Sequence, residues 1–273
     1  LFTSTDPARS TLVAAPDRLV ADGVSASTIS VTLRTQNGDP LPGKPVVLDV
    51  SGEAAYVDGQ PVTGPVPVGL SGPDGLVTAV LTSTAPGVKT IAAAGDGVPL
   101  DEQVQVTFVV GPVDPGASRL ETDETTVFAD GAAYATLTAS LYDSFDHPLP
   151  GLHVLIRARG TDLTLTQPVT TTDEQGQVVA TIHSTAVQPV TVRAFDQTDH
   201  VTLTQVVTLS FVAGPANPSH STVVVTPTTL VADGVQTATV AITLRDLLGH
   251  PASRRPVQLI ASGGGNTITP SAL

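Results

Sequence analysis

The stretch VADGVSASTISVTLR at residues 20–34 returns almost unchanged as VADGVQTATVAITLR at residues 231–245. Nine of the fifteen positions are identical, and a third copy, FADGAAYATLTASLY, lies between them at residues 128–142. The three copies align without a gap over 32 residues, at 21–52, 129–160 and 232–263, with offsets of 108 and 103 residues. Self-similarity at such a period is the signature of tandem structural repeats. The sequence therefore predicts domains of about 100 residues in series.

Each repeat has the pattern of β-structure. In the first copy Ile29, Val31 and Leu33 alternate with Ser and Thr, so a strand would place them on one face. In the third copy Val240, Ile242 and Leu244 alternate in the same way. Val and Thr dominate the chain and no long helical pattern occurs, which favours an all-β protein because β-branched side chains suit a pleated surface.

The turns of the repeat are marked by Pro and Gly. The segment NGDPLPG (37–43) returns as FDHPLPG (145–151) and, weakened, as LGHPASR (248–254). Pro fixes φ and removes a backbone donor, so each of these segments should end a strand and reverse the chain. About seven short strands per repeat, with turn signals every eight to twelve residues, are typical of an immunoglobulin-like β-sandwich. The fold class expected is therefore all-β, with tandem immunoglobulin-like β-sandwich domains in a linear array.

Four motifs together resemble one family. The repeat has ADG before an alternating strand, then N/D-G-x-P-x-P-G-x-x-V, then T-D-x-x-G and finally F-V-A-G-P. This order is similar to the bacterial immunoglobulin-like domain of the intimin/invasin type, over the chain twice completely and once in part. The resemblance implies an extracellular, surface-attached bacterial protein in which stacked domains carry an adhesive tip or build an appendage. The first repeat is five residues longer and the third lacks the LPG of its turn, which affects loop shape only.

The repeat register predicts the domain boundaries. Residues 7–114 and 115–217 each form one immunoglobulin-like domain, and residues 218–273 form an incomplete one that lacks the closing strand. Residues 1–6 are expected to be the end of a preceding domain plus a linker, because Phe2 precedes Pro7 much as Phe108 precedes Pro115. Either the chain is a window cut from a longer array, or a neighbouring chain supplies the missing strands. Phe2 favours the window, and the lack of an initiator Met agrees with an internal or processed segment.

Charge and composition exclude several functions. The net charge is −13 and only two Lys and ten scattered Arg are present, which disfavours binding to nucleic acid or to an anionic membrane surface. The absence of Cys excludes disulfides, thiolate zinc sites and Cys nucleophiles. No stretch approaches the roughly 18 consecutive apolar residues of a membrane span.

The Asp of the ADG motif is the most prominent polar residue of the repeat. We expect Asp22, Asp130 and Asp233 to cap a turn through the neighbouring backbone, with Gly23, Gly131 and Gly234 at positive φ. The alternative is calcium at a domain junction, with further oxygens from a second acidic set: Asp6, Asp114, Glu121, Asp123 and Glu124. Asn217 stands where the third junction would need an Asp, and no EF-hand spacing occurs, so the turn is the favoured interpretation.

No other group of residues has the spacing of a catalytic, metal-binding or phosphate-binding motif. His147 and His250 occupy the same turn position, with Asp39 in the first copy, while His153 and His183 lie in alternating strands without HxH or HExxH spacing. Ser71 lies in no nucleophile elbow, Gly263–Gly265 precede no Lys, and the basic run SRRP (253–256) reads as a turn face. Only Lys44 and Lys89 could form a Lys–Asn isopeptide bond, and the second repeat has no Lys. We therefore assign no catalytic, cofactor-binding or metal site, no cofactor and no enzymatic activity.

The function expected is that of a structural spacer or stalk of a bacterial cell-surface adhesin, which holds a distal adhesive part away from the cell. The alternative is a subunit segment of a self-assembled extracellular filament, in which lateral contacts between copies carry the assembly. The partners expected are neighbouring immunoglobulin-like domains of the same longer chain, or other copies in a filament. A host or surface receptor cannot be named from these residues, and neither nucleic acid nor a membrane span is expected.

Overall fold

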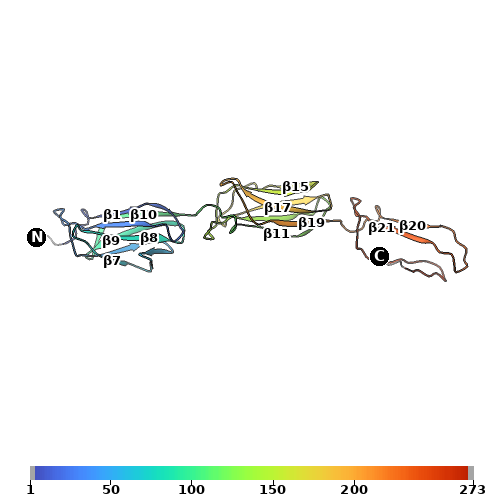
Figure 1. Ribbon diagram of the computed structural model, residues 1–273, viewed down its shortest axis with the longest axis horizontal. Helices are drawn as coiled ribbons and strands as arrows, with labels where there is room; N and C mark the ends of the chain where they lie inside the picture. The colour runs from blue at the N-terminus through green and yellow to red at the C-terminus, as the bar shows by residue number, and fades with distance from the viewer. Residues whose placement is uncertain (1–3, 270–273) are drawn as a thin grey trace.

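The computed structural model describes residues 4–269 and consists of two β-sandwiches and a two-stranded hairpin arranged end to end (Figure 1). The described residues contain strands and turns but no helix, and so no helical segment that could cross a membrane. The prediction of an all-β linear array is confirmed. Phe2 lies outside the described residues.

The first sandwich is formed by ten strands within residues 11–109. They are β1 (Thr11–Ala15), β2 (Arg18–Val20), β3 (Ser27–Thr32), β4 (Pro45–Val50), β5 (Ala55–Val57), β6 (Gln60–Pro61), β7 (Val66–Leu70), β8 (Leu76–Ser83), β9 (Gly87–Gly95) and β10 (Val98–Val109). One sheet has the order β1-β3-β8-β5-β6, and the other has the order β2-β10-β9-β4-β7. All pairs are antiparallel except β2 with β10.

The second sandwich repeats this topology with nine strands. They are β11 (Arg119–Thr122), β12 (Thr126–Phe128), β13 (Ala135–Ser140), β14 (Val154–Arg159), β15 (Leu163–Thr166), β16 (Gln177–Ser184), β17 (Gln188–Asp196), β18 (Val201–Thr202) and β19 (Val207–Val212). Its sheets have the orders β11-β13-β16-β15 and β12-β19-β17-β14, with β18 paired to β17. As in the first sandwich, one short strand, β12, pairs in parallel with the last strand.

Both sandwiches contain more strands than the seven expected because the first strand of each unit changes sheet. In the first unit β1 pairs with β3, and after Pro16 the chain continues as β2 in the opposite sheet. A Pro offers no N–H to a ladder, so the first sheet cannot be continued through this position. The short hairpin strands β5 and β6 in the first unit and β18 in the second add to the number.

The cores confirm the alternation seen in the sequence. Ile29, Val31 and Leu33 are buried between the two sheets of the first sandwich, with Thr28, Ser30 and Thr32 of β3 on the other face. Their counterparts in the second sandwich, Leu137 and Leu141 among them, are fully buried as well. Each sandwich therefore has a continuous apolar core of its own.

The third unit has only the opening part of this fold. β20 (Thr222–Thr226) pairs with β21 (Thr239–Thr243) as β1 pairs with β3, and no further strand follows within residues 244–269. Val240 is 39% exposed, although its counterparts are buried, because no second sheet covers this face. The sequence pattern was right about which residues share a face, but here that face is not a core.

The turn NGDPLPG and its copies have one backbone conformation in all three units. Equivalent isolated bridges join Arg34 to Pro40, Tyr142 to Pro148 and Arg245 to Pro251. Two positions of each turn are left-handed: the fourth (Gly38, Asp146 and Gly249) and the last (Gly43, Gly151 and Arg254). This turn, which we call the Pro turn (35–43, 143–151 and 246–254), lies at the end of its unit that faces the preceding one.

Candidate functional site: the joints between units

Two short segments connect the three units. We call residues 110–114 the first joint and residues 213–217 the second joint. In the first joint the Asp114 N–H donates to the carbonyl of Tyr142, and Val113 is buried against the second core. In the second joint the Asn217 N–H donates to the carbonyl of Arg245. Both joints are therefore held by the unit that follows them rather than being free linkers.

The last residue of each joint caps a tight turn. Asp114 Oδ1 accepts hydrogen bonds from the N–H groups of Gly116 and Ala117, at 2.7 and 2.9 Å. Asn217 Oδ1 accepts one from Ser219 N–H at 2.9 Å, and Asp6 Oδ1 accepts one from Ala8 N–H at 3.0 Å. This role needs only a short side chain with an acceptor oxygen, which explains why Asn can replace Asp.

A Ser four residues further on fixes the same turn to the strand end. Ser10, Ser118 and Ser221 each accept a hydrogen bond at 3.0 Å through Oγ, from the N–H groups of Arg34, Tyr142 and Arg245 respectively. The second and third of these hydroxyls also donate to the carbonyl of the same residue. The register of these three Ser residues in the sequence thus reflects a repeated side-chain bridge at the entrance to each unit.

The ADG turns have the conformation that the sequence predicted. Gly23, Gly131 and Gly234 have φ of 74°, 76° and 72°. The preceding Asp accepts two backbone N–H groups through Oδ1, as Asp130 does from Ala132 and Ala133 at 2.8 Å each. The hydrogen bonds from these N–H groups hold the pKa of Asp130 below its usual value, and the matching bonds to Asp22 and Asp233 have the same effect.

A buried carboxylate in the Pro turn binds the first joint. Asp143 Oδ2 accepts from the N–H of Gly111 at 2.8 Å and faces Nδ1 of His147 at 2.9 Å. Its Oδ1 accepts from the N–H groups of Phe145 and His147. The Asp143 side chain is 0% exposed and that of His147 is 13% exposed, so these contacts replace water almost completely.

The ring of His147 also reaches the preceding sandwich. Its Nε2 lies 2.8 Å from the carbonyl oxygen of Thr84, in the loop between β8 and β9. The Asp143–His147 pair thus connects the joint, the Pro turn of the second unit and a loop of the first unit. Gly23 lies at the same end of the first unit, since a Cβ added to it would be 2.9 Å from Thr84 Cγ2.

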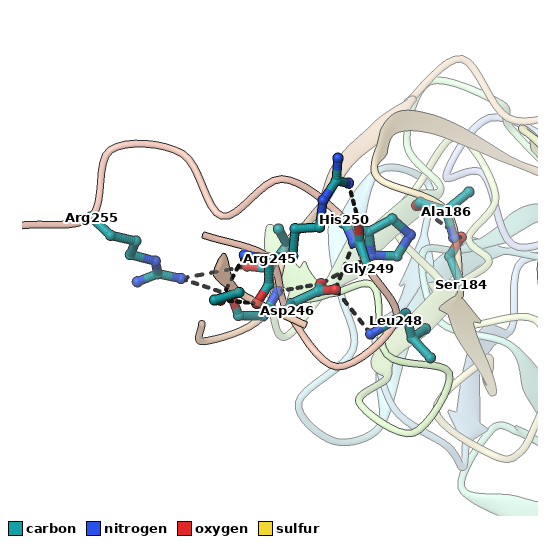
Figure 2. A network of polar contacts seen from close by, with 11 residues as sticks. Ser184, Ala186, Arg245, Asp246, Leu248, Gly249, His250 and Arg255 are labelled. Atoms are coloured by element: carbon teal, nitrogen blue, oxygen red, sulfur yellow. Dashed lines mark hydrogen bonds and ion pairs between the residues drawn. The ribbon is translucent and has the colours of Figure 1, made fainter. Parts of the chain in front are cut away.

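The second joint repeats the pair with one difference. Asp246 Oδ2 accepts from Gly214 N–H at 3.0 Å and faces His250 Nδ1 at 3.0 Å, with Leu248 and His250 N–H on Oδ1 (Figure 2). Here Arg255 approaches the joint, and its Nη2 donates to the carbonyl of Gly214 at 3.2 Å (Figure 2). Within residues 4–269, no hydrogen bond reaches Nε2 of His250. Arg255 comes from the SRRP run, which the sequence assigned only to a turn face.

Both buried carboxylates are held in the charged form. Burial opposes the charge of Asp143, but hydrogen bonds from the Gly111 and His147 N–H groups outweigh it and keep its pKa below the usual value. The pKa of Asp246 is likewise lowered, because hydrogen bonds from His250 and Gly214 outweigh the effect of burial. A charged carboxylate that accepts several N–H groups is a strong and specific anchor for the joint.

The acidic residues considered for calcium do not come together. Asp22, Asp130 and Asp233 cap their own turns, and Asp123 Oδ1 accepts from Thr136 N–H at 2.7 Å. Among residues 4–269 no group of three or more His, Asp or Glu side chains could hold a metal ion. Asp114 and Asp6 each accept a hydrogen bond from a nearby backbone N–H group through Oδ1.

The remaining candidates have structural roles or none. Ser71 is buried, and its Oγ bridges the Leu41 carbonyl and the Lys44 N–H, as Thr172 does in the second unit. His153 is exposed before β14 and His183 lies half-buried in β16. Gly263 and Gly265 have positive φ in a segment without strands.

The two lysines of the first unit are engaged with oxygens and not with an Asn. Lys44 Nζ lies 2.6 Å from Asp96 Oδ2 at the surface. Lys89 is 2% exposed, and its Nζ donates to the backbone carbonyl of Glu53. Burial lowers the pKa of Lys89, and the negative charge of Glu53 opposes this change. Val190 occupies the equivalent position of the second unit, so this buried amine is specific to the first.

Sequence reasoning did not find Asp143 and Asp246. A signal was present, because both residues lie four positions before the matching His, in the same turn, at the repeat offset of 103. The first copy lacks this Asp–His spacing, since Thr35 and Asp39 stand at the two positions, and so the spacing is not common to all three copies. The cross-domain partner Thr84 contributes only a backbone carbonyl, which carries no residue signal.

Two family models match the two sandwiches. Residues 6–111 match the model described as Invasin, domain 3, and residues 117–212 match the bacterial Ig-like domain (group 1). A curated relative, the inverse autotransporter adhesin YeeJ of Escherichia coli K12, is 26% identical over 242 residues. That match covers 88% of this chain and 10% of YeeJ.

Solved structures of two adhesins are similar in fold to this chain. The crystal structure of invasin, a bacterial integrin-binding protein, is 25% identical with a TM-score of 0.59, and the match covers 90% of this chain and 48% of the solved invasin chain. The structure of FdeC, an adhesin of Escherichia coli, is 22% identical with a TM-score of 0.60, and the match covers 93% of this chain and 78% of the solved FdeC chain. The chain thus spans about a tenth of the curated relative and about half of the solved invasin chain. The two sandwiches thus belong to the bacterial immunoglobulin-like domain repeats of the intimin/invasin type, which places the chain at the bacterial cell surface.

Proposed function

We propose that this chain is a non-catalytic spacer of a bacterial surface adhesin, which holds a distal adhesive part away from the cell. The observation that carries the proposal is the end-to-end order of the units, with joints anchored by buried hydrogen bonds (Figure 1). A spacer must keep its length, and a joint bound by the following unit resists folding back more than a free linker of the same length would.

The proposed units are residues 7–114, 115–217 and 218–273, with residues 1–6 as the end of a preceding domain plus a linker. The proposed partners are neighbouring immunoglobulin-like domains of the same longer chain. Invasin is an integrin-binding protein, and by analogy a receptor-binding part would lie elsewhere in the complete adhesin.

The test compares the chain with a version that is shorter by one repeat. Deletion of residues 112–214 joins Gly111 to Pro215 and so restores the Gly–Pro sequence of a joint. Both chains are displayed on cells between an outer-membrane anchor and a small epitope, beside a Gly/Ser linker with as many residues as the intact chain. The intact chain should present the epitope beyond the surface polysaccharide, and both other versions should present it less. Equal presentation by all three would refute the spacer.

Small-angle scattering of the purified chains separates the spacer from the filament. For a spacer, the largest dimension should fall by one repeat length on deletion, and the apparent mass should not depend on concentration. A compact profile for the intact chain would contradict the proposal. Growth of the apparent mass with concentration would favour the alternative, a filament subunit.

A further inference from the structure

The two ring nitrogens of His147 both face hydrogen-bond acceptors. Nδ1 lies 2.9 Å from Asp143 Oδ2, and Nε2 lies 2.8 Å from the Thr84 carbonyl oxygen. A neutral imidazole has one N–H and one lone pair, whereas the protonated ring has two N–H groups. Both contacts can be hydrogen bonds at the same time only if the ring is protonated, or if Asp143 carries the proton instead.

The surroundings of Asp143 argue against a proton on its carboxyl group. Its two oxygens accept backbone N–H groups from Gly111, Phe145 and His147, and these acceptors would be weakened by protonation. The same hydrogen bonds outweigh burial and lower the pKa of Asp143, so it stays ionised in mildly acidic solution. The proton that completes the network therefore belongs on the imidazole of His147.

We propose that the first joint is a pH-responsive connection between the two sandwiches, closed by the protonated form of His147. In that form the ring donates to Asp143 on its own turn and to Thr84 on the preceding unit, which restricts the angle between the units. When the ring loses a proton, the charged Asp143 carboxylate keeps the remaining N–H on Nδ1. Nε2 then presents a lone pair to the Thr84 carbonyl oxygen at 2.8 Å, and the contact between the units is lost. The proposal is independent of the spacer function, because it concerns only the stiffness of this joint.

Other charged groups lie at this end of the first sandwich and on the joint. Asp22 belongs to the ADG turn beside Thr84, and its carboxylate is occupied by Val24, Ser25 and the Ser25 hydroxyl. Lys89 is buried on Glu53 in the loop whose Ala54 carbonyl binds Thr84 N–H. On the second unit the neighbouring charged groups are Asp146 of the Pro turn and Asp199, whose carboxylate lies 3.4 Å from Val113 N. Of the groups named here, His147 is the one whose type changes charge between about pH 5 and 8.

The second joint provides an internal control. Asp246 and His250 reproduce the pair, but within the described residues Nε2 of His250 bonds to nothing, and Arg255 makes the extra contact instead. A neutral His250 with its proton on Nδ1 satisfies Asp246, so this joint should not need a protonated ring. A guanidinium also keeps its charge at all relevant pH values.

The test uses the complete 273-residue chain with two spin labels. The chain has no Cys, so Thr78→Cys on β8 and Val179→Cys on β16 provide the only labelling sites, both exposed and equivalent in the two sandwiches. Pulsed dipolar spectroscopy then measures the distribution of distances across the first joint at pH 5 and at pH 8. The proposal expects a narrow distribution at pH 5 and a broad one at pH 8.

Two variants assign the effect. His147→Gln keeps a side chain of similar size that does not titrate, and it should abolish the narrowing at pH 5. His250→Gln, the matched control, should leave the narrowing unchanged. Equal widths for the unsubstituted label pair at the two pH values would overturn the proposal, as would narrowing that persists in His147→Gln or disappears in His250→Gln.

Discussion

Gly176 is the position at which one methyl group should destabilise the second sandwich most clearly. It ends the TDEQG turn with φ of 74°, and its carbonyl accepts the N–H of Leu141 at 2.9 Å. A Cβ at this position would lie 2.5 Å from the Leu141 carbonyl oxygen and 2.9 Å from Leu149 N. These two backbone atoms are themselves hydrogen-bonded to each other, so neither can move without breaking the Pro turn.

The expected cost of Gly176→Ala has two parts. A left-handed conformation costs a residue with a Cβ about 1–2 kcal/mol. The contact with fixed backbone adds about 1–3 kcal/mol, as overpacking typically does. Gly151→Ala is the matched control, because Gly151 has φ of 81° but nothing within 4 Å of the added Cβ. Only the first part should apply there, so the difference between the two variants measures the contact.

Hydrogen exchange followed by mass spectrometry can assign the loss to one sandwich. Peptides from 119–212 should exchange faster in Gly176→Ala, while peptides from 11–109 should be unchanged, because stability is local in such arrays. Gly75→Ala should give the mirror image, since its Cβ would meet the Leu33 carbonyl oxygen in the same way. The reasoning would be refuted if Gly176→Ala were no more destabilising than Gly151→Ala, or if both sandwiches lost protection together.

Three further predictions concern individual side chains. Gly131→Val should destabilise the second sandwich by about 1–3 kcal/mol, because a β-branched residue is strained at positive φ and its Cβ would meet Thr185; an unchanged melting temperature would contradict this. Lys89→Leu should leave the first sandwich equally stable or raise its stability by up to about 2 kcal/mol, because a poorly compensated buried charge is removed; a clear loss in a denaturant titration would show that the Glu53 contact matters more. Acid should destabilise the sandwiches as pH falls below about 4, because Asp22, Asp130 and Asp143 have a lower pKa in the folded chain than in the unfolded chain. The unfolded chain therefore binds more protons in this range. Acid unfolding monitored by circular dichroism checks this, and a flat profile from pH 6 to pH 2 would oppose it.

The parts of the fold that depend on neighbours in sequence were predictable. Alternation placed Ile29, Val31 and Leu33 in the core, and the ADG motif gave both the Asp cap and the positive φ of its Gly. In such patterns the residues that determine a conformation are neighbours in sequence of the residues that adopt it, so the sequence alone reveals them. The change of sheet between β1 and β2 was not predictable in this way, because it depends on pairing with β10 near the other end of the unit.

The joint contacts depend on residues far apart in the chain. Asp143 binds a backbone N–H 32 residues earlier, and His147 contacts a carbonyl 63 residues earlier. Main-chain groups occur at every position, so no residue type marks either partner. The D-x-x-x-H spacing could have indicated that the two side chains meet, but not what they hold.

The two kinds of Asp at the joints differ in whether Asn can replace them, and this difference explains which residue each joint has. Asp114 caps a turn with one oxygen, and Asn217 does the same at the second joint. Asp143 and Asp246 use both oxygens and face a His, and they are Asp at both joints. An amide could not accept on both sides, whereas a carboxylate can.

The location of these anchors also determines where the array can bend. Gly111, Val113 and Asp114 are bound by the second sandwich, and Gly214 and Asn217 are bound by the third unit. The preceding unit contacts the second sandwich at this end through the Thr84 carbonyl, which faces His147 of the Pro turn. Each joint therefore folds with the unit that follows it, and we expect the array to bend where the last strand, β10 or β19, meets the joint. At the first joint this place is spanned by the His147 contact, so a single proton there acts where we expect the angle between the sandwiches to change.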